Sequence, residues 1–246
     1  MIDDDFMKVV FNDKASAELL LRIILDKPLN VEQVNSEYVI SNIHGRSVRL
    51  DILASDENGT IYDIEVQKDN GGAHVKRARY NSSMLDSNVT EPGEQYKNIR
   101  ETYVIFITEN DILGGGMPLY HIERIITEMH KPFGDGAHII YVNNEIKDET
   151  QLGKLMSDFK CRDASEMNYK ILADRVRYFK ENEKGVTQVC EAVEKLIMSE
   201  ARKYEACGRA YGEKIGEARG EEKIINKMRA AGMTEEQINS ILNISA

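Results

Sequence analysis

The chain contains few of the residues that build disulfide or thiolate scaffolds. Its 246 residues include three cysteines, four prolines and no tryptophan. Cys161, Cys190 and Cys207 stand far apart without a CxxC pair, so the sequence indicates neither a disulfide framework nor a thiolate metal site. We expect all three thiols to be reduced.

Long apolar runs are also missing. No run approaches the ~20 residues that a membrane-spanning helix needs. The acidic opening, "MIDDDFMKVV", differs from the basic start and long apolar stretch of a signal peptide. These features predict a cytoplasmic protein with no membrane partner.

Acidic residues outnumber basic ones, with 42 Asp and Glu against 32 Lys and Arg, for a formal net charge of -10. Duplex affinity comes mostly from phosphate neutralisation by Lys and Arg, so this balance argues against broad, nonspecific coating of nucleic acid. A local basic patch or a bound divalent metal can still overcome it. With 41% hydrophobic and 30% charged residues, the composition is that of a globular protein with a core.

Helix and strand patterns alternate along the first three quarters of the chain. Residues 15–26 carry leucine and isoleucine at helical spacing, and residues 34–68 predict three strands in a meander. A helical segment, "AHVKRARYNSSMLDSN", and two apolar strands, "ETYVIFIT" and "GAHIIYV", follow. This order predicts an α+β or mixed α/β fold. We expect one domain over residues 1–180 and a helical tail over residues 181–246.

The tail combines a glycine repeat with a short helical hairpin. Four glycines recur every four residues: Gly208, Gly212, Gly216 and Gly220. They predict a marginal helix or one whose glycine stripe lies against a partner. Gly232 as a cap and a capping box from Thr234 to Gln237 predict the hairpin. Its second helix, "TEEQINSILN", has no Lys or Arg, which favours partner contact or self-association over a DNA-reading helix-turn-helix.

The stretch "RLDILASDENGTIYDIEVQK" is the most informative, because its hairpin register can be derived. A two-residue turn at Asn58 and Gly59 would mix acids with aliphatic residues on each face. A type I turn that starts at Asp56, with Gly59 in a left-handed bulge, separates the faces. The aliphatic pairs would then be Leu50 with Val66, Ile52 with Ile64 and Ala54 with Tyr62.

In this second register Asp51 faces Glu65 and Arg49 faces Gln67. Directly opposed residues have Cβ atoms about 4.5–5.5 Å apart, so the two carboxylates can share one cation. Oxygen ligands without His or Cys nearby favour Mg²⁺ or Mn²⁺ over Zn²⁺. Such an ion can polarise a phosphate and lower the pKa of an attacking water. The pattern alone leaves open a solvent-facing hairpin whose acids are simply hydrated.

The hairpin resembles the Asp, spacer, Glu-x-Gln signature of the PD-(D/E)XK nuclease superfamily, in the variant with Gln at the usual Lys position. The later motifs resemble PD-(D/E)XK nuclease family transposases, related to the Rpn recombination-promoting nucleases: "KRARYNSSMLD", "GEQYKNIRETYVIFIT", "DILGGGMPLYHIER", "GAHIIYVN" and "LGKLMSDF". The resemblance runs from about Asp5 to Phe179. It implies a restriction-endonuclease-like core, in which a mixed sheet of three to five strands, flanked by helices, presents the site at one edge.

The resemblance also implies residue roles. Asp51 and Glu65 would bind the metal, joined by the backbone carbonyl of Val66, and Gln67 would orient the attacking water or contact the scissile phosphate. Leu50 replaces a proline, and Gln67 replaces a lysine, which removes a fixed positive charge. The implied function is a metal-dependent DNA endonuclease, linked to recombination or transposition. The alternative is a catalytically weak or inactive nuclease-fold protein that binds DNA or a partner.

Two further acids and one basic cluster are candidates. Glu18 would add an acid to the site, or would be a hydrated helix-face residue near Arg22. Asp63 would support the site, or would be hydrated at an edge. The basic cluster follows the hairpin and consists of Lys76, Arg77 and Arg79, next to Tyr80. We expect it to contact DNA phosphates, with ordinary surface salt bridges as the alternative.

Overall fold

The computed structural model describes residues 4–42, 45–68, 70–161, 163–191, 194, 198, 224–226, 228–230, 233–234 and 237. The chain divides into two units, Met1–Val193 and Glu194–Ala246. The four repeated glycines and Gly232 lie outside the described residues, so the predictions made for them stay untested. The capping box of the tail is confirmed. The Thr234 amide donates to Gln237 Oε1 at 3.0 Å, and the Gln237 amide donates to Thr234 Oγ1 at 3.3 Å.

The first unit is built on a mixed sheet of six strands in the order β1-β2-β3-β4-β8-β5. β1 (Val31–Ile40), β2 (Val48–Asp56) and β3 (Ile61–Gln67) form the antiparallel meander. β4 (Thr102–Thr108) and β8 (Ala137–Asn143) continue in parallel with β3, and β5 (Leu119–Ile122) is an antiparallel edge. A separate pair follows, β6 (Ile125–Ile126) with β7 (Lys131–Pro132).

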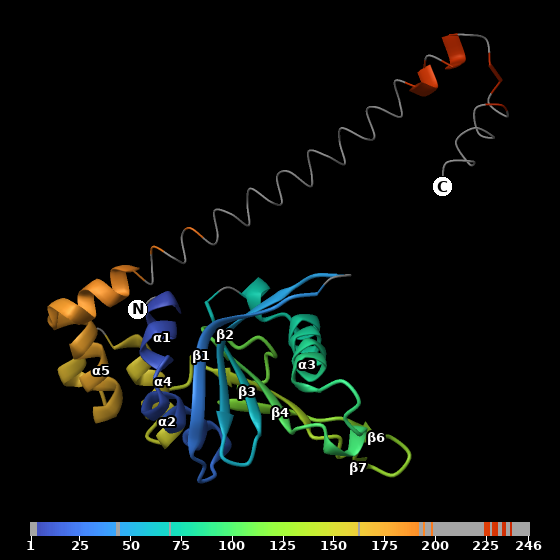
Figure 1. Ribbon diagram of the computed structural model, residues 1–246. Coiled ribbons are helices and arrows are strands. Elements are labelled where there is room, and N and C mark those ends of the chain that lie inside the picture. Colours follow the sequence, from blue (N-terminus) through green and yellow to red (C-terminus); the bar gives the residue numbers. More distant parts are fainter. Residues whose placement is uncertain are drawn as a thin grey trace. The chain divides into compact units, whose positions relative to one another are not determined.

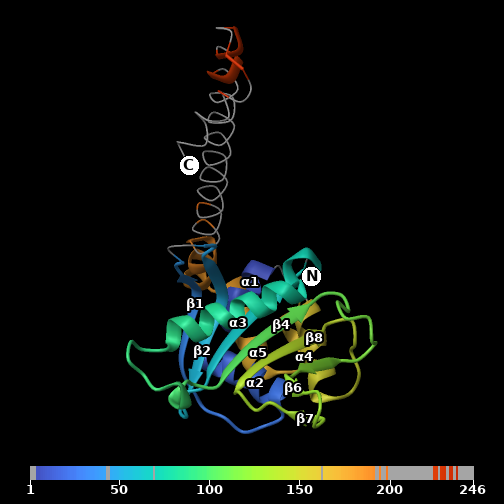
Figure 2. The same ribbon diagram turned by 90° about the vertical axis from the view of Figure 1, so that its right-hand side faces the viewer.

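Helices cover both faces of this sheet. Four lie on one face: α1 (Asp4–Phe11), α2 (Lys14–Leu25), α4 (Gln151–Lys160) and α5 (Lys170–Glu181). Figure 1 shows α3 (Val75–Val89) alone on the other face, and Figure 2 shows it crossing in front of the strands. Three short 3-10 turns complete the unit: η1 (Asn70–Ala73), η2 (Tyr96–Asn98) and η3 (Ala164–Glu166). The predicted mixed α/β class, with a central sheet flanked by helices, is confirmed.

One predicted detail of the sheet is wrong: the main sheet has six strands instead of three to five. The strands that carry the predicted acids, β2 and β3, are interior strands of the sheet. Both of their faces can therefore be covered by helices.

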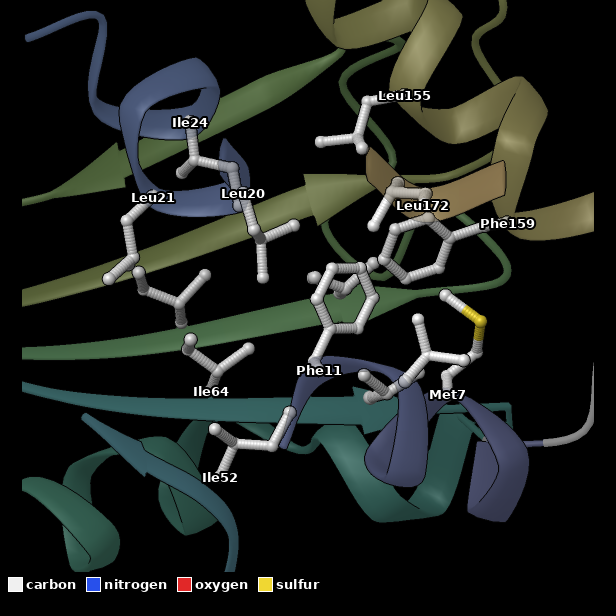
Figure 3. Packing of buried hydrophobic residues seen from close by; sticks show 14 of the residues in the cluster. Met7, Phe11, Leu20, Leu21, Ile24, Ile52, Ile64, Leu155, Phe159 and Leu172 are labelled. Atoms are coloured by element: carbon white, nitrogen blue, oxygen red, sulfur yellow. The ribbon is translucent and has the colours of Figure 1, made fainter. Parts of the chain in front are cut away.

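The larger core cluster lies between the sheet and the four helices. Met7 and Phe11 of α1 and Leu20 of α2 belong to one cluster with Ile52 and Ile64 of the hairpin (Figure 3). The ring of Phe11 stacks on that of Phe159 from α4, with 5.3 Å between centroids. This packing fixes α1 directly against the strands of the hairpin.

A second cluster lies under α3, where Ala78 and Leu85 pack with Phe106. Leu50 belongs to this cluster and not to the one that contains Ile52, so its predicted place on the aliphatic face is wrong. The pairing of β2 with β3 ends at Ile52 and Ile64, so Leu50 is not held in register with β3. In the neighbouring strand β1, Glu37 lies between the pairing partners of Leu50 and Ile52 and has a left-handed φ of 55°.

Within the described residues no helix is both long enough and apolar enough to cross a membrane.

Candidate active site

Next to its turn the hairpin adopts the predicted register, whereas the predicted pairs of Leu50 with Val66 and Arg49 with Gln67 do not form in the β2–β3 ladder. Ile52 pairs with Ile64 and Ala54 pairs with Tyr62. Gly59 has a φ of 81°, and its amide donates to the carbonyl of Asp56 at 3.0 Å. This is the predicted type I turn followed by a left-handed glycine.

The backbone ladder between β2 and β3 ends at Ile52 and Ile64. Beyond this point, backbone amides of one strand donate to side-chain carboxylates of the other. The Val66 amide donates to Asp51 Oδ2 at 3.1 Å, and the Asp51 amide donates to Glu65 Oε1 at 3.3 Å. Each carboxylate thus accepts a bond from the strand that carries the other. The structure brings Asp51 and Glu65 together at the end of the β2–β3 pairing, as the sequence predicted.

Both acids are buried, which excludes the hydrated hairpin. Asp51 is 7% exposed and Glu65 is 0% exposed. Burial raises the pKa of Asp51, against the lowering effects of Lys8 and the Val66 amide. Burial, followed by the charge of Asp51, raises the pKa of Glu65 to about 8. Ionising the two carboxylates therefore costs free energy, and nearby positive charge stabilises their ionised forms.

Two cations meet the pair, one from each side of the sheet. Lys8 of α1 places Nζ 3.1 Å from Asp51 Oδ1. Arg77 of α3 places Nη2 2.6 Å from Glu65 Oε2. Sequence reasoning missed Lys8 altogether, although one lysine inside the apolar run "FMKVVF" was a usable signal. It assigned Arg77 to the DNA-contacting cluster, whereas the structure joins Arg77 to the carboxylates.

Gln67 links the two carboxylates. Its Nε2 donates to Asp51 Oδ2 at 3.2 Å and to Glu65 Oε2 at 3.1 Å, while its Oε1 accepts from Arg77 Nη1 at 3.2 Å. Arg77 Nη1 also donates to the Gly72 carbonyl at 2.7 Å. A Cβ atom on Gly72 would lie 2.2 Å from Gln67 Oε1, so this amide position requires glycine at residue 72. Gln67 is therefore oriented by its neighbours.

Asp63, two residues before Glu65 on β3, is fully buried. The alternative in which Asp63 is hydrated at an edge is therefore wrong. Asn81 of α3 donates to Asp63 Oδ2 at 3.3 Å and lies 3.5 Å from Glu65 Oε1. Burial and the charge of Glu65 raise the pKa of Asp63 well above its ordinary value. Its Oδ1 is buried and has no hydrogen-bond partner in the described part of the chain. The cluster thus contains more acceptor oxygens than its donors satisfy.

Glu18 is not brought to this site. Its Oε2 accepts from the Val31 amide at 3.0 Å, and its Oε1 pairs with Arg22 at 2.8 Å, the contact that its alternative interpretation predicted. Val31 is the partner of Asp56, which lies roughly 16 Å along β2 from Asp51 at the usual rise of a strand. Glu18 therefore joins α2 to β1.

The other residues of the basic cluster lie on α3. Lys76 and Arg79 are exposed. Tyr80 donates its hydroxyl to the Arg46 carbonyl and accepts from Asn42 Nδ2 at 3.3 Å, so it fastens the β1–β2 connection to α3. DNA contact by this cluster stays a prediction.

The donor set fits a hard, hydrated cation. No three or more His, Cys, Asp or Glu side chains are grouped to hold a metal within the described residues. Mg²⁺ is commonly bound by one or two carboxylates and keeps several waters, so Asp51 and Glu65 suffice. The buried Oδ1 of Asp63 is an acceptor that no donor satisfies in the described part of the chain. The Val66 carbonyl, directly after Glu65 in the chain, stays the predicted backbone ligand.

A sequence model of the family described as PD-(D/E)XK nuclease family transposase matches residues 4–207. No curated protein and no solved structure matches the chain. The family match spans most of the chain and includes the hairpin with Asp51, Glu65 and Gln67. The chain therefore belongs to the PD-(D/E)XK nuclease family transposases, and its mixed sheet flanked by helices is a restriction-endonuclease-like core.

Proposed function

We propose that this protein is a metal-dependent endonuclease that hydrolyses phosphodiester bonds in DNA, with Mg²⁺ or Mn²⁺ as its cation. The observation that carries the proposal is the convergence of buried Asp51 and Glu65 on Gln67 where the β2–β3 ladder ends. A family of nucleases supports DNA as the substrate. We further propose that cleavage serves recombination or transposition.

Each residue of the site has its own role in the proposed hydrolysis. Asp51, Glu65 and the Val66 carbonyl hold the cation, which when bound polarises the phosphate and lowers the pKa of a water. Gln67 presents its amide between the two carboxylates and orients the water or contacts the phosphate. Arg77 fixes both Glu65 and Gln67. Asp63 accepts a hydrogen bond from Asn81, whose amide also contacts Glu65, and so helps to orient that amide.

DNA approaches along α3 in this proposal. Lys76 and Arg79 are three residues apart on the helix that also delivers Arg77, so they share one side of it. Both are exposed and available to phosphates on either side of the scissile bond. They provide the local positive charge that an acidic chain needs to bind DNA. Self-association through the helical tail and a cytoplasmic location stay predictions.

The test is cleavage of supercoiled and linear DNA by the purified protein with Mg²⁺, Mn²⁺ or EDTA. Asp51→Ala and Glu65→Ala should abolish metal-dependent cutting. Glu18→Ala is the matched control, because that acid pairs with Arg22 away from the site. Equal cutting by wild type and both site variants would refute the assignment.

One observation favours a second candidate, a catalytically weak or inactive nuclease-fold protein that binds DNA or a partner. Each oxygen of Asp51 and Glu65 already faces a protein donor. A cation must therefore compete with the charge of Lys8 and with the amide of Gln67 for these oxygens. Absence of cutting, together with absence of Mn²⁺ binding by calorimetry, would select this candidate.

A further inference from the structure

Lys8 reaches the carboxylate cluster from a helix that core packing holds in place. Met7, Val10 and Phe11 of α1 are buried at 2%, 0% and 0% exposure. The Lys8 side chain is itself only 15% exposed, with Nζ 3.1 Å from Asp51 Oδ1. The ammonium group is therefore positioned by the fold and not by a chance contact at the surface.

The ion pair between Lys8 and Asp51 contributes little net stability to the fold. Taking a lysine and a carboxylate out of water costs much of what their attraction returns, and an apolar residue at the same place is often as stabilising. Position 8 lies among Met7, Val9 and Val10, where an apolar side chain would extend the core. Besides countering the charge of buried Asp51, a lysine at this position places a positive charge within the site.

Arg77 and Lys8 occupy different settings. The guanidinium of Arg77 donates to Glu65, Gln67 and Gly72 and lies 5.8 Å from the centroid of the Phe106 ring. These contacts hold it in one orientation, as a positioning residue. The ammonium of Lys8 is a compact charge with three donors on a flexible stem. The side chain of Lys8 is 15% exposed, against 35% for Arg77, and it pairs with Asp51, whose side chain keeps 9% exposure, whereas Glu65 keeps none.

The reaction needs a positive charge beside the carboxylates that is not fixed to Glu65 and Gln67 as Arg77 is. A phosphodiester brings negative charge to a site that already contains Asp51, Asp63 and Glu65, and Gln67 is neutral. Once Asp51 has a divalent counter-charge, the Lys8 ammonium can turn to an oxygen of the phosphate. Charge-assisted donors aimed at developing negative charge are among the largest contributions to catalysis.

We propose that Lys8 is a catalytic residue of the phosphodiester hydrolysis, donating to the scissile phosphate and balancing the charge that develops on it. This rests on the proposed function above. Water oxygen bonds to phosphorus, the bond from phosphorus to the leaving sugar oxygen breaks, and a proton from the water ends on that oxygen. Lys8 keeps its own protons throughout.

The test uses the full chain with Lys8→Gln, which removes the charge, and Lys8→Arg, which keeps it. Lys170→Gln is the control, at an exposed lysine at the start of α5. Single-turnover cleavage with Mn²⁺ is measured beside two readouts that need no turnover: calorimetric binding of Mn²⁺, and binding of the same DNA with Ca²⁺, which takes oxygen ligands with looser geometry. Thermal unfolding monitors the folding of each variant.

We expect Lys8→Gln to cut about 10²–10³ times more slowly, the usual effect of removing one donor to a developing oxyanion. Lys8→Arg should recover most of that loss, and Lys170→Gln should match wild type. Mn²⁺ should bind Lys8→Gln as tightly as wild type or more tightly, because a competing cation beside Asp51 is gone. Adding Gln67→Lys to Lys8→Gln should restore part of the rate.

Two results overturn the proposal while the nuclease function stands: Lys8→Gln cuts at the wild-type rate, or it loses Mn²⁺ binding together with cleavage. The second result would mean that Lys8 only builds the metal site. If Lys8→Gln does not fold, a folded Lys8→Arg or Lys8→Gln/Gln67→Lys chain that does not cut also overturns it. Absence of cutting by wild type itself overturns the proposed function and this inference together.

Discussion

Gly72→Ala separates the geometry of the site from the stability of the fold. The added Cβ would lie 2.2 Å from Gln67 Oε1 and 3.5 Å from Arg77 Nη1. The atom that must give way is the end of a flexible side chain, so Gln67 rotates out and leaves its contacts with Asp51, Glu65 and Arg77. The backbone of η1 can stay where it is.

The magnitudes follow from those contacts. Losing hydrogen bonds to charged groups costs about 1–3 kcal/mol in total. Alanine in place of glycine returns about 0.4–1 kcal/mol by restricting the unfolded chain. We therefore expect a net loss of no more than about 2.6 kcal/mol in a denaturant titration. A misplaced group at a reacting centre costs about 10²-fold in rate, so cleavage should fall far more than stability does.

A double-mutant cycle checks the cause. If the clash with Gln67 is the mechanism, Gly72→Ala has no further effect on cleavage once Gln67→Ala has removed the amide. The assay is single-turnover DNA cleavage by wild type, each single variant and the double variant. Wild-type cleavage by Gly72→Ala, or equal further loss in the Gln67→Ala background, would refute the reasoning.

Three other predictions concern charge and stability. Arg77→Met should lower the free energy of unfolding by about 2–4 kcal/mol because it leaves buried Glu65 unpaired, and adding Glu65→Gln should recover most of that loss in the same urea titration. Asp56→Ala should cost about 2–4 kcal/mol, since its carboxylate accepts from two amides and the Tyr62 hydroxyl; a loss no larger than that of Glu57→Ala, at an exposed neighbour, would contradict this. Mn²⁺ at 100 times its Kd should raise stability by about 2.7 kcal/mol, reversed by EDTA and absent in Asp51→Ala, and an equal rise in that variant would place the metal elsewhere.

The hairpin could be predicted because its signals are local. Asp56 and Gly59 select the turn, and the turn sets the register of the Ala54–Tyr62 and Ile52–Ile64 pairs, next to which Asp51 and Glu65 meet. The family motif then identifies these same residues. Neither argument needs the rest of the chain.

The two cations could not be placed in the same way, because tertiary packing brings them in. Lys8 is 43 positions before Asp51 and reaches it only because α1 packs on the hairpin. In the sequence, Arg77 belongs to a run of basic residues typical of a surface cluster. It reaches Glu65 because α3 packs on the other face of the sheet. The change of face at Leu50 occurs where the pairing of β2 with β3 ends, which the sequence pattern of the hairpin does not indicate.

The central claim is that Asp51 and Glu65 hold the catalytic metal, and a crystal structure with Mn²⁺ tests it most directly. The account predicts an anomalous peak at roughly 2–2.3 Å from oxygens of both carboxylates, with Lys8 Nζ turned away from Asp51. The matched crystal of Asp51→Ala should lack that peak. A peak at another place, or crystals without a peak in which Lys8 and Gln67 keep their contacts with the carboxylates, would contradict the account.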